Sequence, residues 1–144
     1  MPIASPPFEI LLVEDNAADV RLTIEALKDT RLPNRLQVAR DGVEALRMLR
    51  DESDATPRPD LIVLDLNLPR KDGREVLQEI KQDDRLRHIP VVILSTSQSE
   101  QDVAQCYALR ANAFVTKPVE IDQFFHAIRS LAQFWLEAVR LTRP

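Results

Sequence analysis

Five short apolar runs recur along this chain, and a segment with helical periodicity follows each of them. The runs read FEILLV, LQVA, LIVLD, IPVVILS and AFVT, at Phe8–Val13, Leu36–Ala39, Leu61–Asp65, Ile89–Ser95 and Ala113–Thr116. Continuous apolar runs of this length are typical of strands that are buried on both faces of a sheet. Their alternation with helices predicts an α/β fold, with a single doubly wound parallel sheet and helices on both sides.

The helical segments carry their apolar residues on one face and begin at capping residues. We expect helices over residues 17–29, 43–52, 74–83, 99–110 and 120–141. Asn16 and Asp41 are the expected N-caps of the first two helices, and either Ser97 or Ser99 caps the fourth. The last segment, EIDQFFHAIRSLAQFWLEAVRL, is the longest, so we expect an extended C-terminal helix.

Length and composition favour one soluble domain. In the 144 residues we place this domain at residues 8–131, between a flexible lead-in at 1–7 and an extension of the last helix and a tail at 132–144. A net charge of -4 argues against a nucleic-acid partner and against an anionic membrane surface. The single cysteine, Cys106, excludes an internal disulfide, and no hydrophobic stretch reaches the length of a membrane span. The N-terminus has no signal-peptide pattern, so we expect a cytoplasmic protein.

Polar side chains follow the predicted strands at the points where the strands end. Glu14 and Asp15 follow the first run, Asp65 ends the third, Ser95 ends the fourth and Lys117 follows the fifth. Because ligands of parallel sheets bind beyond the carboxyl ends of the strands, we expect these side chains to meet at one edge. Three carboxylates there repel one another by about 4 kcal/mol per pair, at a separation of about 4 Å and an effective dielectric constant of about 20.

One lysine cannot neutralise three carboxylates, so the cluster predicts a divalent cation, and its oxygen ligands favour Mg2+. Asp15, Asp65 and a backbone carbonyl would hold the ion directly, and Glu14 would reach it through water. An aspartate in such a site can attack phosphorus and become an aspartyl phosphate, while Lys117 and the Ser95 hydroxyl each hold a phosphoryl oxygen. No base for turnover on small molecules is evident, so the site is suited to accept a phosphoryl group and hold it.

Four blocks, ILLVEDN, LIVLDLNLPRKDG, PVVILSTS and FVTKP, resemble in order and spacing the receiver domain of bacterial response regulators. The resemblance covers residues 8–131 and implies a parallel sheet in the strand order 2-1-3-4-5. More narrowly, the VEDNAAD start and the AQFWL tail resemble the small response regulators that partner bacterial phytochromes, the Rcp type. This narrower resemblance implies a phytochrome-type histidine kinase as phosphodonor and a homodimer.

The resemblance assigns a role to each matched residue. Asp65 is the implied phosphoacceptor, Lys117 the phosphate-binding lysine, and the Asn67 backbone carbonyl a metal ligand beside the acidic side chains. Ser95 is the implied switch hydroxyl and Phe114 the switch aromatic. Their coupled movement would alter the surface formed by the fourth helix, the fifth strand and the fifth helix.

The resemblance also implies a cis peptide bond before Pro118. The chain departs from the family pattern in two informative places. The acidic pair is Glu14 and Asp15 rather than the commoner Asp-Asp, and glutamate still suits a water-mediated contact. A glycine common before the fifth strand is replaced within LRANAF, so Arg110 or Asn112 must end the helix, and asparagine is the better candidate for left-handed backbone.

The last helix carries more apolar residues than one face can bury. Besides an inward stripe of Phe124, Ile128 and Leu131, the helix carries further apolar positions, which are Phe125, Phe134, Trp135, Leu136, Val139 and Leu141. Aromatic residues on an exposed helix favour an interface. We therefore expect a homodimer through this helix, with an interface at Phe125, Phe134, Trp135 and Val139. The alternative is that the helix folds back on its own domain.

Three functions are consistent with these patterns to different degrees. The favoured one is a single-domain response regulator of a two-component phosphorelay, phosphorylated on Asp65 by a histidine kinase with Mg2+ and catalytic only on itself. A second is a phosphorylation-independent scaffold that dimerises and binds partners. A third is a phosphatase of the haloacid dehalogenase type, which should carry a second acid two residues after its nucleophile, where this chain has Asn67. With two glycines, the chain lacks the glycine-rich loops of nucleotide-binding proteins.

Overall fold

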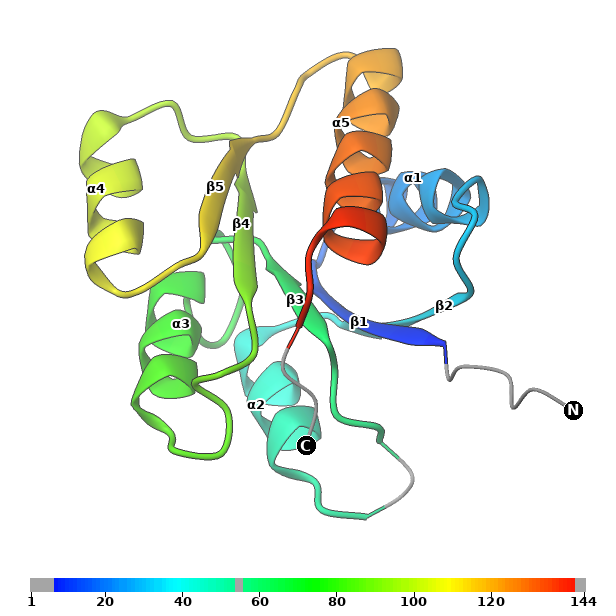
Figure 1. Cartoon of the computed structure of the whole chain (residues 1–144). Helices are drawn as coiled ribbons and strands as arrows, with labels where there is room; N and C mark the ends of the chain where they lie inside the picture. Colours follow the sequence, from blue (N-terminus) through cyan, green and yellow to red (C-terminus); the bar gives the residue numbers. More distant parts are fainter. Residues whose placement is uncertain (1–6, 54–55, 142–144) are drawn as a thin grey trace, which may run out of the picture.

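The computed structural model describes residues 7–53 and 56–141, in which strands and helices alternate (Figure 1). The strands are β1 (Phe8–Val13), β2 (Asn34–Ala39), β3 (Leu61–Leu64), β4 (Val91–Ser95) and β5 (Ala113–Thr116). The helices are α1 (Ala17–Lys28), α2 (Gly42–Arg50), α3 (Gly73–Gln82), α4 (Glu100–Ala108) and α5 (Ile121–Gln133), and a π-helical turn, η1 (Phe134–Ala138), continues α5. Residues 1–6 and 142–144, where we expect most of the lead-in and the end of the tail, lie outside the described residues.

The five strands form one parallel sheet in the order β2-β1-β3-β4-β5, which confirms the expected fold class and strand order. Helices α1 and α5 cover one face of the sheet, and α2, α3 and α4 cover the other (Figure 1). Because all strands are parallel, their carboxyl ends lie at one edge of the sheet.

Alternating side chains of the central strands fill two separate cores. In β4, Val91 and Ile93 pack in the core beneath α2, α3 and α4, whereas Val92 and Leu94 pack in the core beneath α1 and α5. This alternation follows from the two-residue period of a strand, and it requires apolar residues at every position of a doubly covered strand. Burial of each such side chain contributes about 1.5–3 kcal/mol of transfer free energy.

Three predicted helix caps are present. Asn16 accepts a hydrogen bond from the Asp19 amide at 3.0 Å, and Asp41 accepts one from the Glu44 amide at 2.8 Å. Of the two serines considered for α4, Ser99 is the N-cap, and its hydroxyl accepts from the amide of Asp102 at 3.3 Å. Caps of this kind typically stabilise a protein by about 1 kcal/mol each.

The end of α4 differs from our expectation that Asn112 adopts left-handed backbone. Arg110 takes that conformation instead, with a φ of 77°. The Asn112 side chain has a different role, because its Oδ1 accepts from the Val91 amide at 2.8 Å and from Lys81 Nζ at 3.2 Å. The asparagine thus accepts the hydrogen bond of the first amide of β4. Arg110 therefore takes the left-handed backbone conformation, although this conformation is unfavourable for arginine.

The C-terminal helix is extended, as expected, but it ends three residues earlier than the expected Leu141, since Val139 has extended backbone. Leu136 is buried, and Trp135 and Leu141 pack against the core beneath α1 and α5. Much of the apolar excess therefore folds back on its own domain, while Phe134 remains 56% exposed. Among the described residues, no helix has both the length and the apolar character needed to cross a bilayer.

Candidate functional site

The carboxyl-terminal edge of the sheet brings together the polar residues that follow the strands. The ladder of backbone hydrogen bonds extends past the strand ends, because the Asp65 amide donates to the Val13 carbonyl at 3.0 Å and the Lys117 amide donates to the Ser95 carbonyl at 2.6 Å. The backbone of Asp65 is therefore fixed by β1, and that of Lys117 by β4. The sheet itself positions these side chains.

Three carboxylates converge at this edge. Glu14, Asp15 and Asp65 each place an oxygen within 4.8 Å of the others. Glu14 and Asp65 are 2% and 8% exposed, whereas Asp15 is open to solvent. A partly open cluster of hard oxygen ligands suits a divalent cation that keeps some of its water.

The Lys117 ammonium is buried among carboxylates. Its Nζ lies 2.7 Å from Glu14 Oε1, 2.9 Å from Asp19 Oδ2 and 3.4 Å from Asp65 Oδ2. Lys117 is 8% exposed, so these contacts are poorly screened by water. One ammonium cannot balance the carboxylates that face it, which leaves a net negative site able to attract a cation.

Burial and charge shift the proton affinities of this group. Burial raises the pKa of Glu14 to about 7, with a further increase from the charge of Asp65, against the hydrogen bond from Lys117 that lowers it. Burial lowers the pKa of Lys117, but hydrogen bonds to Glu14 and Asp19 and the attraction of Asp65 outweigh it, so the pKa of Lys117 is raised. The ammonium therefore stays charged at neutral pH.

Helix α3 begins directly against the backbone of Asp65. A Cβ on Gly73 would lie 2.3 Å from the Asp65 carbonyl oxygen and 2.6 Å from the Leu66 Cα, and the Gly73 amide donates to the Leu66 carbonyl at 2.9 Å. The Asn67 amide donates to Asp65 Oδ1 at 3.2 Å. The loop between β3 and α3 thus holds Asp65 from both its backbone and its side chain.

Asp19 and Gly73 are two site residues that the sequence reasoning did not identify. Asp19 reaches Lys117 from the first turn of α1, and its spacing of four residues from Asp15 was the available signal. Gly73 lies within the LNLPRKDG block, and the scarcity of glycine elsewhere could have marked it.

Ser95 and Phe114 lie on the neighbouring strands β4 and β5. Ser95 is fully buried, and its Oγ accepts from the Ser97 amide at 3.2 Å, whereas Thr96 is exposed. Phe114 is partly buried against the core beneath α2, α3 and α4, and its amide donates to the Tyr107 hydroxyl at 3.1 Å. Their coupled switching stays a prediction.

The loop after β4 is tied to α3 by a chain of polar contacts. The Ser97 hydroxyl donates to Asp102 Oδ2 at 2.6 Å, and Arg74 Nη2 donates to Asp102 Oδ1 at 2.8 Å. Because Ser97 also contacts Ser95, these contacts link the buried hydroxyl to the helix that begins beside Asp65.

The peptide bond before Pro118 is trans, so the expectation of a cis bond is wrong. The trans isomer is the lower-energy form of most X-Pro bonds. Lys117 still reaches the acidic cluster from this backbone.

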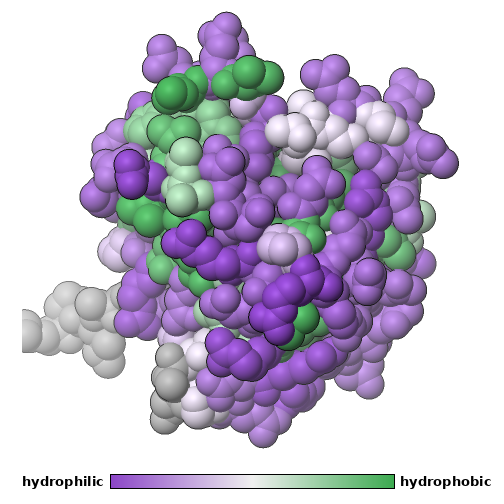
Figure 2. Space-filling view, turned by 180° about the vertical axis from the view of Figure 1, so that it is seen from behind, coloured by the Kyte–Doolittle hydropathy of each residue, from purple (hydrophilic) through white to green (hydrophobic). Residues whose placement is uncertain are grey.

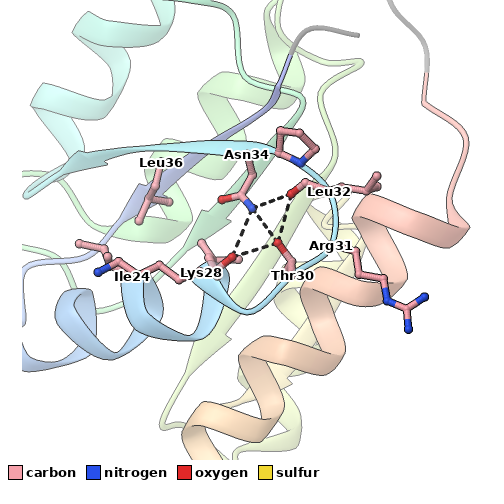
Figure 3. Close-up of a pocket in the computed structure, with 9 residues that line it drawn as sticks. Ile24, Lys28, Thr30, Arg31, Leu32, Asn34 and Leu36 are labelled. Carbon is pink, nitrogen blue, oxygen red and sulfur yellow. Dashed lines mark hydrogen bonds between the residues drawn. The ribbon is translucent and has the colours of Figure 1, made fainter. Parts of the chain in front are cut away.

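A pocket of about 540 Å³ lies away from this edge, between the end of α1 and the start of β2 (Figure 3). Asn34 Nδ2 donates there to the Leu32 carbonyl at 3.1 Å and to the Thr30 hydroxyl at 2.8 Å. These bonds close the turn into β2, at the amino end of the strand. None of the clustered acidic residues lines this pocket.

The comparison with known families agrees with this geometry. The model of the response regulator receiver domain matches residues 10–129. This chain belongs to the response regulator receiver domain family. In this family, an acidic cluster such as that of Glu14, Asp15 and Asp65 is typical of the divalent-cation site.

Several relatives match this receiver domain over nearly its whole length. The response regulator Rcp1 of Synechocystis is 48% identical over 140 residues, which cover 96% of this chain and 95% of that protein. The crystal structure of the phosphorylated cyanobacterial phytochrome response regulator RcpA has a TM-score of 0.92 at 47% identity and covers 96% of this chain and 100% of that one. The structure of the Mn2+-bound form of Rcp1 has a TM-score of 0.90 at 47% identity, with coverages of 95% and 100%. This chain is thus a receiver-domain response regulator akin to the phytochrome response regulators.

Proposed function

We propose that this protein accepts a phosphoryl group from a histidine kinase on Asp65 and signals through the change in structure that follows. The observation that carries the proposal is the convergence of two further carboxylates and the Lys117 ammonium on the Asp65 side chain. A relative of similar structure has been crystallised in a phosphorylated form, which supports the proposal.

In the proposed transfer, a carboxylate oxygen of Asp65 forms a bond to phosphorus while the phosphorus–nitrogen bond of a phosphohistidine breaks. The imidazole nitrogen leaves with the electron pair of that bond, and the product is an aspartyl phosphate. The Lys117 ammonium, 3.4 Å from Asp65 Oδ2, is near enough to pair with a phosphoryl oxygen. The Ser95 hydroxyl would take a second oxygen after a movement of the loop that follows β4.

Mg2+ is the proposed cofactor. The side chains of Asp15 and Asp65 and the backbone carbonyl of Asn67 would hold it, with Glu14 in contact through water. When bound, the cation neutralises charge on the phosphoryl oxygens. These residues fit Mg2+, because they offer oxygen ligands whose negative charge exceeds the positive charge of Lys117. One relative, Rcp1, has been crystallised with Mn2+.

The test is intact-mass analysis after incubation with acetyl phosphate. We expect a single phosphoryl adduct in the presence of Mg2+, and removal of the cation with EDTA should prevent its formation, because the carboxylates then repel the incoming phosphate. If folded protein gives no adduct under either condition, the proposal is wrong and a phosphorylation-independent scaffold becomes the better explanation.

The signal would leave through the surface of α4, β5 and α5. Movement of Ser95 towards the phosphoryl group would break its contact with the Ser97 amide and open space for Phe114 to turn inward. Tyr107 lies on this surface, is 48% exposed and accepts from the Phe114 amide. Its environment would therefore change when Phe114 moves.

The proposed kinase is of the phytochrome type. Rcp1 and RcpA are relatives of nearly the same length as this chain, and RcpA is described as a cyanobacterial phytochrome response regulator. Identity of 47–48% over 95–96% of the chain supports this partner more than a match confined to the site residues would.

A homodimer through the end of α5 and η1 is also proposed, with Phe125, Phe134, Trp135 and Val139 at the interface. Phe134 is 56% exposed, and its ring packs edge-on against Trp135 with the centroids 5.7 Å apart. Seen from behind, apolar residues gather at the upper left of the molecule and elsewhere lie singly among hydrophilic ones (Figure 2). The exposed ring of Phe134 is the aromatic anchor that we propose for self-association.

We expect Phe134→Ser to weaken self-association by tenfold or more, about 1.4 kcal/mol or above, because it removes an exposed aromatic anchor. Sedimentation velocity over a series of micromolar concentrations measures this effect. The matched control is Val43→Ser on α2, where an apolar side chain of 38% exposure is removed elsewhere. A wild-type protein that sediments as a monomer, phosphorylated or not, would contradict the dimer.

A further inference from the structure

The carboxylate of Asp19 stands outside the acidic cluster but shares its lysine. The cluster that could hold a cation consists of Glu14, Asp15 and Asp65. Asp19 lies on the first turn of α1, and its side chain is 21% exposed. Its backbone is held at both ends, because its amide donates to Asn16 Oδ1 at 3.0 Å and its carbonyl accepts from the Thr23 hydroxyl at 2.8 Å.

The three N–H groups of Lys117 are divided unequally among three carboxylates. The short contacts go to Glu14 at 2.7 Å and to Asp19 at 2.9 Å, and the contact with Asp65 is the longest at 3.4 Å. A distance of about 3.4 Å lies beyond the usual range for an N–H···O hydrogen bond. The ammonium thus lies closer to Glu14 and to Asp19 of α1 than to the proposed phosphoacceptor.

We propose that Asp19 is a positioning residue for Lys117, which restrains the ammonium and limits how much of its charge the incoming phosphoryl group receives. This inference rests on the proposed function of Asp65. During transfer, negative charge on the phosphoryl oxygens must be neutralised, and Lys117 is the cation that the chain itself supplies there. A fixed anion on the same ammonium opposes that neutralisation and also repels the donor. Asp19 therefore slows phosphoryl uptake.

The test compares initial rates of adduct formation on the full chain with acetyl phosphate at saturating Mg2+, measured by intact mass. Asp19→Asn keeps an oxygen that can accept from Lys117 but removes the charge, so we expect the rate to rise about threefold to tenfold. Asp19→Glu restores the charge, and its rate should return towards that of the wild type. A variant that was merely damaged in folding would lose rate rather than gain it.

Glu25→Gln is the matched control, because it removes the same charge from the same helix at an exposed residue paired with Lys28. Its rate should equal that of the wild type. If Asp19→Asn reacts at the wild-type rate or more slowly while the wild type forms its adduct, the role of Asp19 is refuted and the function of Asp65 stands. If the folded wild type forms no adduct, both proposals fail together.

Discussion

Replacement of Asp65 by asparagine should abolish phosphorylation altogether. The amide of asparagine is a poor nucleophile, and no other group of the site takes its position, because the Asp65 backbone is fixed by the Val13 carbonyl and by the close approach of Gly73. We expect the Mg2+-dependent adduct of the wild type to disappear, a loss of rate of at least about a thousandfold, or about 4 kcal/mol in activation free energy. Intact-mass analysis after acetyl phosphate treatment measures it.

The melting temperature in the presence of Mg2+ is an independent measurement on the same variant. Asp65→Asn removes one carboxylate from a cluster in which three of them lie within 4.8 Å, so added Mg2+ should raise the melting temperature of the variant less than that of the wild type. Asp84→Asn is the control, since Asp84 lies in an exposed ion pair with Arg87 in the loop before the amino end of β4, at the opposite edge of the sheet. An adduct that persists in folded Asp65→Asn would place the phosphoacceptor elsewhere.

Gly73→Ala should damage both the fold and the site. Its Cβ would lie 2.3 Å from the Asp65 carbonyl oxygen and 2.6 Å from the Leu66 Cα, and both neighbours are backbone atoms that cannot rotate away. Alanine is favoured over glycine in a helix by about 1 kcal/mol, but overpacking against fixed backbone typically costs about 1–3 kcal/mol and more where nothing yields. We expect a net loss of about 2 kcal/mol in unfolding free energy, measured by urea denaturation.

Gly42→Ala separates the two effects of that substitution. Its Cβ would lie 2.3 Å from the Lys71 carbonyl oxygen, so the clash is similar, but Asp65 is not among the atoms nearest to it. Both variants should lose stability, whereas the rate of phosphoryl uptake should fall clearly more in Gly73→Ala. Equal rates in the two folded variants would show that the approach of Gly73 does not position Asp65.

Both predictions with glycine concern space rather than backbone conformation. Neither Gly42 nor Gly73 has a positive φ, and within residues 7–53 and 56–141 the residues that do are Arg70 and Arg110. A turn pattern in the sequence therefore could not have indicated why glycine is required at these two positions. The requirement arises where the loop between β3 and α3 meets α2 on one side and Asp65 on the other.

Local sequence pattern is enough to predict the alternation of strands and helices, the parallel sheet and the edge at which the site lies. These features depend on local periods and on which residue ends each strand, so they can be read along the chain. The convergence of Glu14, Asp65 and Lys117 follows from the same reasoning, because parallel strands must end at a common edge. The helix caps Asn16 and Asp41 are local for the same reason.

Other features depend on distances between elements far apart in the chain, so they follow only from how these elements pack. Asp19 and Lys117 are 98 residues apart, and their 2.9 Å contact exists only because α1 begins beside the end of β5. The hydrogen bond from the Val91 amide to the Asn112 side chain also joins distant residues, and Arg110 rather than Asn112 has the left-handed backbone at the end of α4. The packing of Leu136 on its own domain is a third such feature. An apolar residue gives the same sequence pattern whether its own chain or a second chain covers it. The sequence gives the polar and apolar groups that each segment carries, and the packing of helices and strands determines which groups come into contact.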